Sequence, residues 1–407
     1  MQKILIFTPK ISPRIQYIFD FILQDFSGID YEITTNIQFF ETSEKIKINY
    51  SDSEIPNSFF LKSDNFLFES GTNNLLNFSD LNKVGQCFFA LSRYEEYQIQ
   101  KKDHHQRISG KKRVYKTPFV DEWILQFQSE FQEKYPEIKF KKREFSLWLS
   151  CDVDQTWKYK HKGFKRRWGA NIRDLARLNF KEILKRETVI SGKEKDPFDT
   201  FDYFKSLHDS KKVDKLIFFW LLGNYGKFDK NNPVNNSFFQ QKISEISAWA
   251  ESGLHPSYAS NSNFNQLKIE KKRLENILNF PVKKSRQHYL KLNLPETYQN
   301  LLAAGITEDY SMAYADETGF RAGTCTPFYW YDLEKEKKTE LKIYPFCAME
   351  VSMRNYMQLN PEEAIAELQR LKHEIRKVKG NMTVLFHNSN LTEEWKDWKK
   401  VLDSIAK

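Results

Sequence analysis

The chain contains 407 residues, of which 40% are hydrophobic and 29% charged; it can therefore form a core, and a disordered polyelectrolyte and a collagen-like repeat are both excluded. Lysine and arginine (63) outnumber aspartate and glutamate (54), which gives a formal charge of +9. No nucleic-acid-binding motif accompanies this excess, and we expect no nucleic-acid partner.

The cysteines lack the spacing of a metal finger or a redox motif. No window reaches the roughly 18 apolar residues of a membrane span, and the apolar run at 4–7 is too short for a signal peptide. We therefore predict a cytoplasmic protein without a membrane span.

Residues 1–143 are predicted to form a small α/β domain, because short apolar segments alternate with amphipathic ones. The segments with strand character are 4–8, 31–34, 45–50 and 58–62. The segments with helical spacing are 15–26, 84–97 and 119–135.

Residues 144–407 are predicted to form a second domain, which begins after the basic stretch 139–143. The segments with strand character are 145–150, 216–222, 343–351 and 382–386. The segments with helical spacing are 237–252, 268–278 and 361–379. This alternation is typical of a parallel α/β sheet or barrel.

Candidate chemical groups follow several of these strands, at the edge where such folds bind ligands. Asp152 and Asp154 follow 145–150, where one acid can act as a general base and the other can bind a divalent cation. A helix cap or a salt bridge would use the same residues. His387 ends the segment 382–386, a place suited to acid catalysis or to a structural hydrogen bond.

Two further clusters lie between these strands. His255 follows the predicted helix 237–252 and can bind a metal as a neutral imidazole, although a lone histidine is more often a packed residue. Arg286, close to His288, can hold a carboxylate and keep it ionised, or form an ordinary ion pair.

The stretch 316–330 is dense in glycine, arginine and aromatic residues. Aromatic faces and polar groups of this kind suit a sugar-binding wall, and a buried aromatic core is the alternative. The residues predicted to contact substrate are Asp316, Arg321, Phe328 and Trp330, together with Tyr258 near the first histidine.

The order of these motifs resembles the polysaccharide deacetylase family, the NodB-homology carbohydrate esterases of family 4. The resemblance covers about residues 145–390. Arg93-Tyr94-Glu95-Glu96-Tyr97 and the stretch 118–123 resemble landmarks of Bacteroidetes-type members that carry an extra N-terminal α/β domain. It implies a distorted (β/α) barrel that hydrolyses acetyl groups on sugars with a divalent metal, Zn²⁺ first, with Ni²⁺, Co²⁺ or Mn²⁺ as alternatives.

The resemblance also assigns roles to individual residues. Asp152 matches the general base, Asp154 the metal-binding acid and His255 the first metal-binding histidine. Arg286 matches the arginine that orients the base, and His387 matches the general acid.

The chain departs from the family pattern in two places. Val153 separates two acids that are usually adjacent, and Ala259 stands where a second metal-binding histidine is expected. Ser260, Asn261 or His288 is then a candidate third ligand.

The resulting prediction is a metal-dependent hydrolase that removes acetyl groups from a polysaccharide or an amino sugar. Two alternatives stay open: a catalytically impaired saccharide-binding or scaffold protein of polysaccharide biosynthesis, and a hydrolase of a non-sugar amide. The oligomeric state is not predicted.

Overall fold

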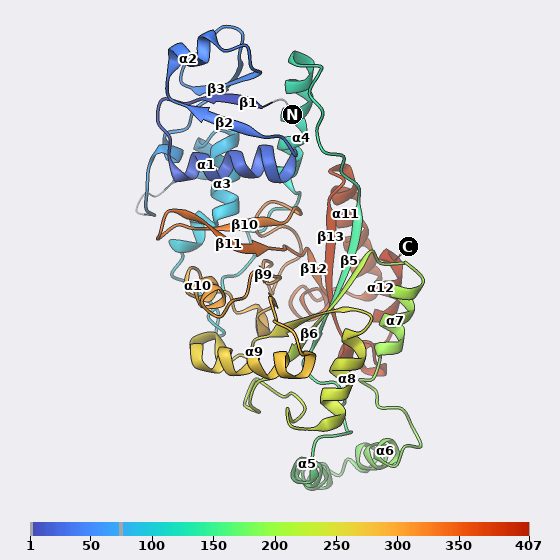
Figure 1. Cartoon of the computed structure of the whole chain (residues 1–407). Coiled ribbons are helices and arrows are strands. Elements are labelled where there is room, and N and C mark those ends of the chain that lie inside the picture. Colours follow the sequence, from blue (N-terminus) through green and yellow to red (C-terminus); the bar gives the residue numbers. More distant parts are fainter. Residues whose placement is uncertain (1–2, 73–75, 407) are drawn as a thin grey trace.

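The computed structural model describes residues 3–72 and 76–406 and contains two β-sheets with helices packed around them (Figure 1). The smaller sheet has the order β2-β1-β3-β4, and all its pairs are parallel. Its strands are β1 (Ile4–Phe7), β2 (Tyr31–Thr34), β3 (Lys47–Ser51) and β4 (Phe59–Lys62). Strand β1 is buried throughout, as expected for a parallel strand that is covered on both faces.

The helices of this N-terminal unit are α1 (Pro13–Phe19), with a π-helical continuation at Asp20–Phe26, α2 (Ile37–Thr42), α3 (Lys83–Ser92) and α4 (Phe119–Lys134). Three of them lie where helical spacing was predicted, although the one predicted at 84–97 ends at Ser92, and α2 was not predicted. Helix α1 begins where the side chain of Ser12 accepts a hydrogen bond from the backbone N–H of Ile15 and Pro13 occupies the first turn.

The larger sheet has nine strands in the order β10-β11-β9-β8-β7-β6-β5-β13-β12. Its strands are β5 (Ser146–Val153), β6 (Lys215–Leu221), β7 (Glu251–His255), β8 (Lys284–Ser285), β9 (Glu308–Asp309), β10 (Phe328–Asp332), β11 (Lys337–Ile343), β12 (Ala348–Met349) and β13 (Asn381–His387). Every pair is parallel except the hairpin β10–β11. The predicted fold class, α/β with a smaller N-terminal sheet and a larger, mostly parallel second sheet, is confirmed; the barrel is incomplete, because β10 and β12 are free edges.

Eight helices are connected to this sheet within the described residues. They are α5 (Phe164–Ala176), α6 (Phe180–Ile190), α7 (Phe201–Asp209), α8 (Ser237–Ser247), α9 (Phe264–Leu278), α10 (Glu296–Ala303), α11 (Pro361–Lys377) and α12 (Trp398–Ile405). Within residues 3–72 and 76–406, no helix is long and apolar enough to cross a bilayer.

Two predicted elements are corrected by the structure. The helix expected at 237–252 ends at Ser247, and Glu251–His255 form β7, which pairs along its length with β6. The strand expected at 343–351 is divided, since Ile343 ends β11 and only Ala348–Met349 pair with β13. In the first place strand pairing overrides the local pattern, and in the second the local apolar pattern does not lead to continuous pairing.

The two sheets share one hydrophobic core that contains residues from both halves of the chain. The hairpin β10–β11 lies against α1 and α3, and the hydroxyl of Tyr17 donates to the carbonyl of Tyr329 at 2.7 Å. The four strands of the smaller sheet precede residue 143 and those of the larger sheet follow it. The division into two domains at this residue stays a prediction.

Candidate functional site

A cluster of polar side chains lies at the carboxyl edge of neighbouring parallel strands in the larger sheet. Strand pairing places His387 opposite Asp152, and His255 ends the strand two places away from β5. The residues brought together at this edge are Asp152, Asp154, His255, Arg286, His288 and His387, which come from the ends of β5, β7, β8 and β13. Parallel topology therefore assembles residues that are more than 200 positions apart in the sequence.

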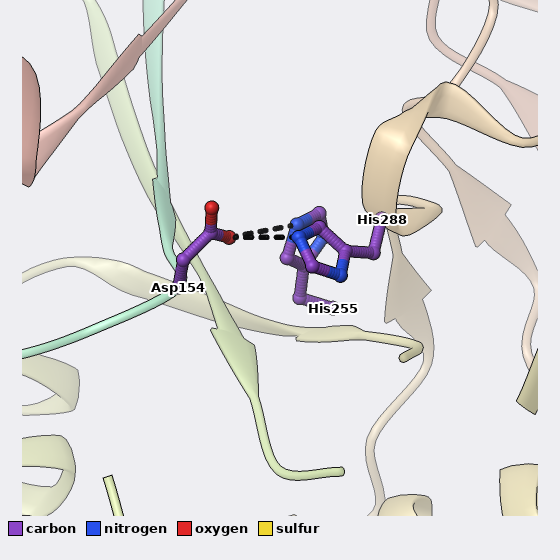
Figure 2. Close-up of side chains that lie close together, drawn as sticks. All are labelled: Asp154, His255 and His288. Carbon is purple, nitrogen blue, oxygen red and sulfur yellow. Dashed lines mark ion pairs between the residues drawn. The ribbon is translucent and has the colours of Figure 1, made fainter. Parts of the chain in front are cut away.

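Three of these side chains form a candidate metal site. Oδ1 of Asp154 lies 3.3 Å from Nε2 of His255 and 3.6 Å from Nε2 of His288, and the three ligand atoms all lie within 4.8 Å of one another. Figure 2 shows the carboxylate of Asp154 pointing at both imidazole rings. Bonds of about 2.0–2.1 Å to a tetrahedral Zn²⁺ would set such atoms about 3.3 Å apart, so the spacing fits a metal.

In both histidines, Nδ1, the ring nitrogen that faces away from Asp154, forms a hydrogen bond to another part of the protein. Nδ1 of His255 donates to the carbonyl of Arg286 at 2.5 Å, and Nδ1 of His288 donates to Asp229 at 2.9 Å. These bonds fix each ring so that Nε2 faces Asp154, which is the usual outer support of metal-binding histidines. Nε2 of His255 and Oδ1 of Asp154 are buried and lack a hydrogen-bond partner among the described residues. Two orphaned atoms facing each other are what a bound cation would satisfy.

The site is strongly negative around His288. Burial alone would lower the pKa of His288, but Asp154 and Asp229 outweigh it and raise the pKa to about 9. Burial would raise the pKa of Asp154, yet His288, His255 and His387 together hold it well below its usual range. The charges that favour a proton between these groups also favour a metal cation in its place.

The loop after His255, which contains Ala259, is bonded to Asp229, a residue that also holds His288. The backbone N–H groups of Tyr258 and Ala259 donate to Asp229 at 2.8 and 3.3 Å, and Asp229 in turn holds His288. Of the candidate third ligands, His288 lies at the site. The hydroxyl of Ser260 instead donates to the carbonyl of Ser257, and the amide of Asn261 donates to the carbonyl of Lys291.

The predicted base and its arginine lie beside the three ligands. Nη1 of Arg286 lies 3.2 Å from Oδ1 of Asp152 and donates to the hydroxyl of Ser150 at 2.6 Å. The guanidinium is fully buried between the rings of Phe219 and Phe346, each 4.7 Å away. Oδ2 of Asp152 remains 3.7 Å from Nε2 of His255. Arg286 therefore contacts one carboxylate oxygen and leaves the other toward the candidate metal site.

His387 is paired with a buried glutamate. Its Nδ1 and its backbone N–H both donate to Oε1 of Glu350 at 2.7 Å. Burial alone would lower the pKa of His387, but Glu350 above all, with Asp154 and Asp152, raises it to about 10. His387 is thus protonated at neutral pH, which is the state that a general acid needs.

These groups open into a cavity of about 520 Å³. Its wall carries the aromatic side chains of Phe228, Tyr289, Tyr356 and Trp395. The N-terminal unit contributes Arg107, which donates to the carbonyl of Tyr289 and to the hydroxyl of Tyr356, each at 2.9 Å. Arg107 therefore positions two aromatic walls of the cavity.

The residues predicted to contact substrate lie elsewhere. Phe328 and Trp330 are buried in β10, and Arg321 is buried with its three side-chain nitrogens bonded to Glu96 and the carbonyl of Ala313. This corrects the prediction, because these side chains pack the two halves of the chain together and do not line the cavity.

The other two predicted contacts are also occupied. Asp316 accepts hydrogen bonds from the backbone N–H of Gly110, at 2.7 Å, and from the hydroxyl of Ser109. Tyr258 lies behind the cavity wall, with its ring 4.3 Å from that of Phe228. It supports that wall and does not form it.

Sequence reasoning missed Asp229, Glu350 and Arg107. Asp229 and Arg107 lie in loops without a local motif. Glu350 left a usable signal, because it interrupts an apolar run next to a sheet edge, where an acid has no role in packing.

Comparison with known proteins gives little beyond the fold. A family of unknown function (DUF7033) matches residues 4–136, which lie outside the candidate metal site. No curated protein matches the chain.

Solved structures of low identity show similar architecture. A presumed polysaccharide deacetylase from Mycobacterium smegmatis is 12% identical with a TM-score of 0.40, over 65% of this chain and 83% of its own. A polysaccharide deacetylase from Bacillus cereus is 12% identical with a TM-score of 0.32, over 65% and 87%. A CE4 family pseudoenzyme from Bacillus anthracis is 13% identical with a TM-score of 0.32, over 65% and 63%. Likenesses at this level do not indicate an activity.

Proposed function

We propose that the protein is a metal-dependent hydrolase that removes acetyl groups from a polysaccharide or an amino sugar, with Zn²⁺ as the metal. The observation that carries this proposal is the convergence of Asp154, His255 and His288, with buried atoms left unpaired, next to a carboxylate and a protonated histidine. Two nitrogens and one oxygen suit Zn²⁺, and three protein ligands leave a position open for water or substrate.

Asp154, His255 and His288 hold the metal in this proposal. When bound, the cation supplies Lewis acidity, which lowers the pKa of water and polarises a carbonyl oxygen. The remaining steps belong to the side chains around it.

Asp152 acts as the general base. Arg286 holds Oδ1 of Asp152, so that Oδ2, close to Nε2 of His255, is the oxygen available to accept a proton from water. This division of the two oxygens keeps the base oriented toward the reacting atoms.

His387 acts as the general acid. Its Nδ1 is held by Glu350, which leaves Nε2 as the nitrogen that can give a proton to the departing amine or alkoxide. The raised pKa keeps His387 protonated until it transfers this proton to the leaving group.

The cavity wall supports a sugar as the substrate. Phe228, Tyr289, Tyr356 and Trp395 offer aromatic faces, and Gln155, Lys230, Asn355 and Asn390 offer polar groups for hydroxyls. A pyranose ring presents both kinds of surface, whereas a small aliphatic amide presents neither in this number.

The test is release of acetate from N-acetylated and O-acetylated sugar oligomers by the full chain, before and after chelation and with Zn²⁺ restored. We expect acetate release that depends on the metal and that is lost in Asp152→Asn. His208→Ala, an exposed histidine on α7, is the control that should retain activity.

Two other outcomes would replace the proposal. Saccharide binding by calorimetry without acetate release would favour the binding or scaffold protein. Hydrolysis of small non-sugar amides but not of acetylated sugars would favour the non-sugar hydrolase.

A further inference from the structure

The helical hairpin α5–α6, residues 164–190, exposes an unusual number of large apolar side chains. In Figure 1 it projects below the body of the molecule, away from both sheets. Seven of the fifteen large hydrophobic side chains that are exposed among the described residues lie here: Phe164, Trp168, Ile172, Leu175, Leu178, Phe180 and Leu184. The exposed fractions of Phe164, Leu178 and Leu184 reach 72%, 74% and 68%. A concentration of exposed apolar side chains of this kind marks an interaction site.

The hairpin has its polar side inside and its apolar side outside. Phe164, Trp168, Ile172 and Leu175 follow one another at intervals of four, four and three residues, which places them on one stripe of α5. The two helices meet instead through a buried ion pair between Arg186 and Asp174. The apolar stripe is therefore left free by the fold.

The hairpin is held firmly at its base. The carboxylate of Asp196 accepts hydrogen bonds from the backbone N–H groups of Lys158, Tyr159 and Lys160 at 2.7 to 3.0 Å. The hydroxyl of Tyr159 donates to Glu182 in α6 at 2.8 Å. These bonds join the two ends of the segment that contains the hairpin, so the hairpin is held in a defined orientation.

The hairpin is also strongly basic. Residues 164–190 contain eight lysines or arginines against three acidic residues, so this short segment holds five of the chain's nine excess positive charges. Lys165, Arg177 and Lys181 are exposed and form no ion pair with any residue that the structure describes. Free cations beside an apolar stripe complement an anionic surface with an apolar interior.

We propose that the α5–α6 hairpin is an interfacial anchor that inserts its apolar side chains into the headgroup region of an anionic lipid bilayer without crossing it. A second copy of the chain is a poorer partner, because two hairpins would bring like charges together. The anchor is independent of the proposed hydrolase activity.

The test is flotation of the full chain with vesicles of phosphatidylcholine alone or mixed with phosphatidylglycerol. We expect binding to the mixed vesicles, at least tenfold weaker binding to phosphatidylcholine, and weakening by salt. Removing three surface charges in K165Q/R177Q/K181Q should lower binding to the mixed vesicles roughly a hundredfold.

An apolar variant and a matched control separate insertion from adsorption. W168S/I172S/L184S should lose binding at least tenfold, whereas I11S/I37S/F39S, which removes three exposed apolar side chains of the N-terminal unit, should not. The charge variant leaves the apolar stripe unchanged, so it still tests the anchor if the apolar variant fails to fold.

Three results would overturn the anchor. They are absence of binding to both vesicles, full binding by both hairpin variants, and a dimer in sedimentation velocity that W168S/I172S/L184S abolishes. The last result would show that a second copy covers the stripe.

Discussion

The carboxyl edge of the larger sheet and the block at residues 316–330 both contain buried charged side chains, but these side chains differ in how their polar atoms are paired. At the sheet edge, Nε2 of His255 and Oδ1 of Asp154 have no hydrogen-bond partner among the described residues and face a cavity. In the block, every side-chain nitrogen of Arg321 has an acceptor, and Glu96 receives two of these bonds.

This difference in pairing distinguishes a candidate ligand site from a structural contact between the two halves of the chain. A buried charge whose partners are all protein atoms links two parts of the fold, as Arg321 links the second sheet to Glu96 of the N-terminal unit. Burial alone would raise the pKa of Glu96, but Arg321 and Arg93 lower it to about 2, so the pair is fully ionised. A buried charge left unpaired at a cavity costs stability, and the fold retains it where a ligand completes it.

The largest contrast should come from Asp154→Ala. At the sheet edge this change removes a metal ligand, so we expect roughly a thousandfold loss of acetate release, because metal catalysis supplies several kcal/mol. Stability of the metal-free protein should fall too, because His255 and His288 lose the anion that faces them, but by less than at a fully buried pair, since the Asp154 side chain is 31% exposed. Acetate release and thermal unfolding measure the two effects, and an Asp154→Ala protein with wild-type turnover would refute the assignment.

In the block, Arg321→Met should act in the opposite way. Removing Arg321 leaves Glu96 with Arg93 as its remaining partner, and should lower the free energy of unfolding by about 3 kcal/mol, the lower end of the range for a broken buried ion pair. Metal content of the folded protein should stay at the wild-type level. Chemical denaturation measures the loss, with Arg177→Met, an exposed arginine, as the control. A stable Arg321→Met protein with a raised KM would instead support the substrate role first predicted for this residue.

A smaller effect is expected from Asp229→Asn. The change keeps the shape but removes the charge that holds Nδ1 of His288, so metal affinity should fall about 10- to 100-fold. Competition with a chromophoric chelator measures this fall. Unchanged affinity would mean that His288 needs no orientation by Asp229.

The smallest effect should be a shift in pH dependence in Glu350→Gln. His387 must be protonated to act as the acid, so activity falls as pH rises through its pKa. Loss of the negative charge of Glu350 lowers that pKa, and the alkaline limb of the rate profile should therefore move to lower pH. A profile that keeps its alkaline limb in place would assign the limb to another group.

Much of the site could be predicted because strand ends in parallel sheets meet at one edge. Asp152, Asp154 and His387 follow segments predicted as apolar strands, whereas His255 and Arg286 lie between the predicted strands. The structure brings all five together. The choice among Ser260, Asn261 and His288 could not be made, because it depends on how the loop after β7 turns and on Asp229, which no local pattern marks.

For residues 316–330, by contrast, the sequence did not predict the role of the side chains. Composition alone cannot distinguish an aromatic wall that faces a ligand from one that faces another part of the chain. Arg321 is buried because it binds Glu96, which is more than 200 residues away in sequence and which no local pattern connects to it. The short strands β8, β9 and β12 were likewise missed or misjudged, since two residues carry no periodic signal.

The central claim is that His288 replaces the histidine that Ala259 cannot supply. Calorimetric titration of Zn²⁺ into the metal-free full chain tests it most directly, with His288→Ala compared against wild type and against His208→Ala. We predict one tight site in wild type and in His208→Ala, and at least a hundredfold weaker binding in His288→Ala. Wild-type affinity in His288→Ala would contradict the claim.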